Sequence, residues 1–145
     1  MIVTVMFLLA GHFANECSAQ GRTGSALAAD YKASAAFAEV RLRKAELDAE
    51  LESGLSEYTA EHPKVKEAKA GLMLLQKEMD RLANAPASSV ERMSAALGKL
   101  MVKKVEAESD LLRLLENLQP AHPDAKRARR KVEIYESAIK EVLGR

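Results

Sequence analysis

The sequence contains few of the residues that cross-link a small domain or interrupt its helices. It has one cysteine, no tryptophan, seven glycines and four prolines in 145 residues, and aromatic side chains make up only 4%. A single cysteine excludes an internal disulfide. The residues that dominate instead are Ala, Leu, Glu, Lys and Arg, which is the composition of long helices and not of sheets.

The chain also lacks an excess of charge of either sign. Lys and Arg number 22 against 21 Asp and Glu, so the net charge is +1. No global field therefore attracts nucleic acid or an anionic membrane, and we expect any partner to be recognised locally. A domain of this size buries roughly two thirds of the surface that its unfolded chain exposes, which is enough for a core.

The first 19 residues differ from the rest. An apolar run, Ile2–Ala10, leads into polar residues and then Cys17-Ser18-Ala19, a small-residue pattern that suits signal-peptidase cleavage. We predict an export signal over residues 1–19 and a periplasmic or secreted mature chain without cysteine. No Lys or Arg precedes the run, and a hydrophobic N-terminal helix is the alternative. The run is too short for a membrane span, which needs ~20 apolar residues.

After a flexible lead at residues 20–26, apolar residues recur in steps of three and four, which predicts helices at about 27–58, 63–83, 89–118 and 123–143. The apolar seam of the first segment returns in the third, displaced by sixty residues, and the second and fourth segments match alike. This predicts internal duplication of a helix-turn-helix unit. The matching seams are Phe37, Val40, Lys44, Leu47, Leu51, Gly54 and Tyr58, and Leu97, Leu100, Lys104, Ala107, Leu111, Leu114 and Leu118.

Each copy carries a His-Pro pair at the same place: His62-Pro63 and His122-Pro123. Proline has no backbone N–H and its φ suits the first residue of a helix, whereas the residue before it is pushed out of the α region. We therefore predict that the two histidines are cap residues and that helices restart at the two prolines. Each pair then marks the tip of an antiparallel hairpin.

The predicted hairpins, 27–83 and 89–145, are joined by a linker at 84–88. Ser88 and Glu91 fit an S-x-x-E capping box, which predicts that the third helix starts directly after Ser88. Short connections between consecutive helices predict an all-α fold in which two tandem hairpins form an up-down-up-down four-helix bundle. Coiled-coil-like rods that pair with other chains are the alternative.

One stretch resembles a known hairpin. LSEYTAEHPKVKEAKAGLMLLQKEM is similar to the periplasmic coiled-coil region of the polysaccharide co-polymerase and chain-length determinant family, where a Tyr-Thr-x-x-His-Pro-Lys-Val turn joins two helices. The matching residues are Tyr58, Thr59, His62, Pro63, Lys64 and Val65. The second copy keeps His122 and Pro123, with Asp124 and Ala125 in place of Lys and Val. The resemblance covers about a third of the chain, without that family's flanking transmembrane helices or kinase domain. It implies hairpin geometry and an envelope location, and no activity.

Polar residues at the tips and in the seams are the candidates for a site. His62 and His122 would approach each other if the tips share an end, and two imidazoles can hold a metal or sense pH. No third ligand recurs beside both, so we favour a role in turn geometry. Lys44 and Lys104 either set the helix register or pack their stems while their ammonium groups reach solvent. We expect leucine at either lysine position to raise the melting temperature.

The densest charge run is KRARRK, Lys126–Lys131. Phosphate or an anionic polysaccharide is a conceivable ligand, but no aromatic side chain accompanies the run and acidic residues follow it. We therefore favour a solvated helix face.

The sequence contains no Ser/His/Asp set, Gly-rich phosphate loop, CxxC pair or HExxH motif. We predict a chain that is not an enzyme, with no catalytic, cofactor-binding or metal residues, no cofactor and no nucleic-acid partner. One hypothesis is a structural or scaffolding protein of the cell envelope that associates with itself or with a coiled-coil partner. The other is a small periplasmic helical chaperone or stress-response binding protein. Its soft contacts would be Met73, Met79, Met93 and Met101.

Overall fold

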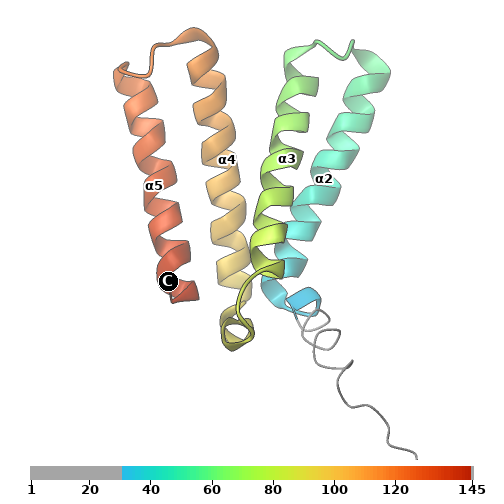
Figure 1. Cartoon of the computed structure of the whole chain (residues 1–145). Coiled ribbons are helices and arrows are strands. Elements are labelled where there is room, and N and C mark those ends of the chain that lie inside the picture. The colour runs from blue at the N-terminus through green and yellow to red at the C-terminus, as the bar shows by residue number, and fades with distance from the viewer. Residues whose placement is uncertain (1–30, 145) are drawn as a thin grey trace, which may run out of the picture.

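The computed structural model of the chain describes residues 31–144, which form an all-α fold of two tandem antiparallel hairpins (Figure 1). The predicted fold class is confirmed. The hairpins form an up-down-up-down four-helix bundle with both tips at one end (Figure 1). The elements are α2 (Ala35–Glu57), α3 (Pro63–Ala83), the 3-10 helix η1 (Ala87–Arg92), α4 (Ala95–Asn117) and α5 (Pro123–Leu143). The predicted export signal at 1–19 and the flexible lead at 20–26 lie outside the described residues.

The two hairpins repeat each other closely. Helices α4 and α5 have the bounds of α2 and α3 displaced by sixty residues. The caps repeat as well, since the side chains of Ser34 and Ser94 each accept a hydrogen bond from the backbone N–H three residues on. The internal duplication predicted from the seams is therefore present in the structure, including its helix ends.

Two predicted helix starts are wrong. Helix α2 does not run from residue 27, because Ser34 has an extended backbone and caps a helix that begins at Ala35. The third helix does not start after a Ser88–Glu91 capping box. Ser88 lies inside η1, so it lacks the extended backbone that an N-cap needs. Ser94 has that extended backbone and caps α4.

Helix α4 organises the bundle. It packs against α2, α3 and α5, whereas α5 packs mainly against α4 and η1. Helix α4 also lies very close to α2 at Gly98, where an added Cβ would be only 2.7 Å from the carbonyl oxygen of Ala36. The largest fully buried apolar side chains are Leu75, Leu82, Leu97, Met101 and Ile139. Figure 1 shows α5 and α2 on opposite sides of the bundle, and we call these two helices its edges.

The helices differ from membrane spans in composition. Among residues 31–144, none of them is both long enough and apolar enough to cross a bilayer.

Candidate functional site

The His-Pro pairs sit at the two hairpin tips. His62 precedes α3, and its Nδ1 accepts a hydrogen bond from the N–H of Lys64 at 3.3 Å. His122 precedes α5, and its Nδ1 accepts from the N–H of Asp124 at 3.2 Å. Pro63 and Pro123 are the first residues of the two helices. This is the capping geometry that the His-Pro spacing predicts.

The contacts of each histidine stay within its own hairpin. The ring of His62 stacks on Tyr58, with 4.1 Å between the ring centroids. The Nδ1 of His122 lies 3.6 Å from a carboxylate oxygen of Asp124. In the part of the chain that the structure describes, no group of three or more His, Cys, Asp or Glu side chains could hold a metal ion. The hydrogen bonds that the structure shows for the two histidines are those of a helix cap.

The two seam lysines have different surroundings. The ammonium of Lys44 is paired with the exposed carboxylate of Asp48 at 2.7 Å, and its side chain is 33% exposed. The side chain of Lys104 is only 6% exposed. The interpretation that the ammonium reaches solvent fits Lys44 and is wrong for Lys104. The copies have diverged at this position.

Lys104 is the centre of a group of charges, two of them buried and three partly buried, that we call the ionic cluster: the buried Lys104 and Glu78, with Glu108 of α4, Arg81 of α3 and Glu136 of α5. The Nζ of Lys104 lies 2.5 Å from Glu78, 3.1 Å from Glu136 and 3.5 Å from Glu108. Arg81 donates two hydrogen bonds to Glu136, at 2.9 and 3.1 Å. Because Glu78 and Arg81 belong to the first hairpin and the other three residues to the second, the ionic cluster joins the hairpins.

Burial and pairing act in opposite directions in the ionic cluster. Burial lowers the pKa of Lys104, but the carboxylates of Glu78, Glu108 and Glu136 outweigh it, and the net shift is upward. Burial raises the pKa of Glu136, but hydrogen bonds from Arg81 and Lys104 lower it to about 2. Lys104 and Glu136 therefore stay charged over the physiological pH range.

Sequence reasoning found one of these five residues. Glu78 was missed, although it follows the buried Leu75 by three residues and so shares its helix face. Its side chain is 1% exposed, and its Oε2 has no hydrogen-bond partner within residues 31–144. Glu78 is a carboxylate on the apolar face of one helix, and Lys104 is a lysine in the apolar seam of another. Opposite charges at two such positions are the sequence signal from which this pair could have been predicted.

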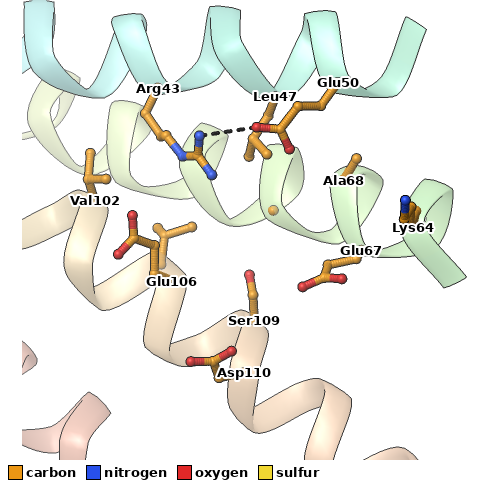
Figure 2. A pocket seen from close by; sticks show the side chains of 12 residues that line it. Arg43, Leu47, Glu50, Lys64, Glu67, Ala68, Val102, Glu106, Ser109 and Asp110 are labelled. Atoms are coloured by element: carbon orange, nitrogen blue, oxygen red, sulfur yellow. Dashed lines mark hydrogen bonds and ion pairs between the residues drawn. The ribbon is translucent and has the colours of Figure 1, made fainter. Parts of the chain in front are cut away.

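A pocket of about 330 Å³ lies between α2, α3 and α4 (Figure 2). Figure 2 shows Arg43 paired with Glu50, at 3.3 Å, on the α2 side. The carboxylates of Glu67, Glu106 and Asp110 line it from α3 and α4. The lining contains neither cysteine nor histidine, and its acidic excess suits contact with a basic group more than nucleophilic chemistry.

A shallower groove of about 370 Å³ lies between α2 and α4. Its apolar lining is Leu42, which is 59% exposed, and the partly buried Val102. Six charged residues of both signs surround these two: Glu39, Arg43, Glu46, Lys99, Lys103 and Glu106. We call this feature the α2–α4 groove. An apolar strip with mixed charge beside it is the kind of surface that receives an amphipathic helix.

Comparison with protein-family models, with curated proteins and with solved structures found no match.

Proposed function

We propose that this chain is a non-enzymatic, exported helical-hairpin protein with a structural or scaffolding role in the cell envelope, exercised through protein–protein contacts. The α2–α4 groove is the observation that carries the proposal. Leu42 is not part of the core and Val102 is only partly buried against it, so the groove is available to the face of a partner helix. The envelope location rests on the apolar N-terminal sequence and on the likeness of the first tip to the periplasmic hairpin region described above.

A scaffold must present its surfaces in a fixed arrangement, and the ionic cluster supports this. Glu78 and Lys104 come from different hairpins and are both buried. Separating the hairpins would break the pair between these two charges. The free-energy cost of breaking it opposes independent movement of the two hairpins. The bundle thus keeps α2 and α4 in a fixed position relative to each other on the two sides of the groove.

A periplasmic chaperone or stress-response binding protein is the second candidate. The exposure of Met73, at 75%, favours it, because flexible methionine side chains suit varied apolar clients. Met93 and Met101, however, are buried in the core. The soft surface expected of such a chaperone is therefore reduced, and the scaffold is the better supported function.

The test is site-specific photo-crosslinking of the full chain in the cells that produce it. A photo-reactive residue replaces Lys103, which is exposed beside the α2–α4 groove, and a control replaces Arg113, exposed elsewhere on α4. We expect a discrete cross-linked protein in the envelope fraction from position 103 and none from position 113. Equal products from both positions, or a chain confined to the cytoplasm, would contradict the proposal.

An aggregation assay separates the second candidate. We expect the protein, at equimolar ratio, to leave the heat-induced aggregation of a model enzyme unchanged. Suppression of aggregation that is lost in Met73→Ser would instead support the chaperone.

A further inference from the structure

The edge formed by α2 is acidic in the half nearest the tip. From residue 45 to its end, α2 has five acidic residues and no basic one: Glu46, Asp48, Glu50, Glu52 and Glu57. All five are exposed. Arg43 and Lys44, one turn below, pair with three of them through exposed contacts of the kind that contribute little to stability. The five acidic residues lie on the two flanks of α2, with Glu46, Glu50 and Glu57 on one flank and Asp48 and Glu52 on the other. We call this exposed part of α2 the acidic edge.

The edge formed by α5 has the opposite charge at the same end of the bundle. Its first ten residues contain one acidic residue, Asp124, and five basic ones: Lys126, Arg127, Arg129, Arg130 and Lys131. All five basic side chains are exposed. Arg127 and Arg130 have local partners, whereas no ion pair joins Lys126, Arg129 or Lys131 to another residue of the described range. We call this surface the basic edge.

The acidic edge and the basic edge lie at the same level along the bundle axis, and their helices are antiparallel. Helix α2 runs towards the tip end and α5 runs away from it, on opposite sides of the molecule (Figure 1). Glu50 and Arg130 are each seven residues from the tip ends of their helices. The exposed aliphatic side chains of Leu42 and Ile134 come within about one helical turn of a common level. An α2 edge placed beside an α5 edge would therefore pair opposite charges and bring two exposed aliphatic residues together.

We propose that copies of this chain associate side by side, with the acidic edge of one copy against the basic edge of the next and the tips at one end. This inference rests on the proposed scaffold function and names a second copy as a partner. The contact continues the up-down alternation of the bundle, because α5 of one copy and α2 of the next are antiparallel. A contact between two identical edges would place like charges together, so the head-to-tail contact is the favourable one. Such contacts build rings or open rows.

Sedimentation velocity of the full chain tests this at low and high salt. We expect oligomers at about 20 mM NaCl and monomers at about 500 mM, since exposed charges are screened within roughly 4 Å at that salt. A wild-type chain that is monomeric at low salt and 100 µM protein overturns the inference.

Charge reversal identifies the surfaces. One variant reverses the basic edge (Lys126→Glu, Arg127→Glu, Lys131→Glu) and a second reverses the acidic edge (Glu50→Lys, Glu52→Lys, Glu57→Lys). Each alone should be monomeric at low salt, with a helical circular dichroism spectrum like that of the wild type. An equimolar mixture should assemble again, because each contact between the two different variants joins opposite charges.

The matched control reverses Lys69 and Lys77, exposed lysines of α3, and should assemble like the wild type. Variants that assemble alone, or a mixture that stays monomeric, overturn the inference. The outcome is separable from that of the proposed function. A monomeric protein that still cross-links from position 103 leaves the scaffold proposal standing, and an oligomer without that cross-link leaves the edge contact standing.

Discussion

Replacing Lys104 by leucine should destabilise the protein, while the same change at Lys44, its counterpart sixty residues earlier, should not. The structure thereby reverses, for Lys104, the gain in melting temperature expected from the seam pattern. Lys104→Leu removes an ammonium 2.5 Å from Glu78, a carboxylate that is otherwise excluded from water. The nearest remaining cation is Arg81, at 3.6 Å from the other oxygen of Glu78.

Breaking a buried pair by removing one partner costs about 3–5 kcal/mol. Because Arg81 remains close, we expect the lower end, about 3 kcal/mol. For a domain of about this length, that free energy corresponds to a fall in melting temperature of roughly 10 °C. Lys44→Leu breaks only a surface pair with Asp48, for which the expected change is about 0–1 kcal/mol.

Urea unfolding followed by circular dichroism measures both variants, and unchanged m-values would show that the unfolded and folded states stay comparable. The double variant Lys104→Leu/Glu78→Leu should recover most of the loss, because it replaces both charges by apolar groups. Equal stability of Lys104→Leu and Lys44→Leu would refute the reasoning, since it would mean that burial of the pair has no energetic consequence.

Three further predictions concern the helix contacts and caps. The pKa of Glu136 is about 2 in the folded protein, against an ordinary 4.5. This difference contributes up to about 3 kcal/mol to the free energy of unfolding, which is present above pH 4.5 and is lost as the pH falls towards 2. The free energy of unfolding should therefore fall less over that pH range in Glu136→Gln than in the wild type. Gly98→Ala should cost about 1–3 kcal/mol in urea unfolding because its Cβ meets the backbone of α2, whereas Gly54→Ala meets only a side chain at 3.4 Å and should gain up to about 1 kcal/mol. Ser94→Ala should lose about 1 kcal/mol of thermal stability and Ser88→Ala almost none, and an equal loss would contradict the cap assignment.

The fold could be predicted from the sequence because the same signals occur twice. Proline after histidine fixes the starts of α3 and α5 through the backbone alone, so Pro63 and Pro123 are found without knowing any tertiary contact. The start of α4 was missed because Ser88 and Ser94 both suit a cap by type. The backbone decides between them, since a turn closed by the hydrogen bond from the Ser89 hydroxyl to the Pro86 carbonyl places Ser88 inside η1.

The ionic cluster could not be predicted, because it depends on how the hairpins face each other. Lys44 and Lys104 occupy equivalent seam positions, and only the neighbouring helices make them different. Glu78 has alanine at the equivalent place in the second hairpin, Ala138, so duplication gave no guide to it. Pairing of charges between helices is a tertiary property, which a repeating local pattern does not specify.

The common orientation of the two tips has a practical consequence. An even number of alternating helices returns the chain to the level at which it started, so Ala35 and Leu143 both lie at the base of the bundle (Figure 1). At 1.5 Å per residue, α2 lifts its tip by roughly 35 Å from that level. An anchor, fluorophore or affinity handle joined at the start of α2 or at the end of α5 would leave both imidazole-bearing turns pointing away from the point of attachment. Immobilised protein would thus present its two hairpin tips, side by side, to the surrounding solution.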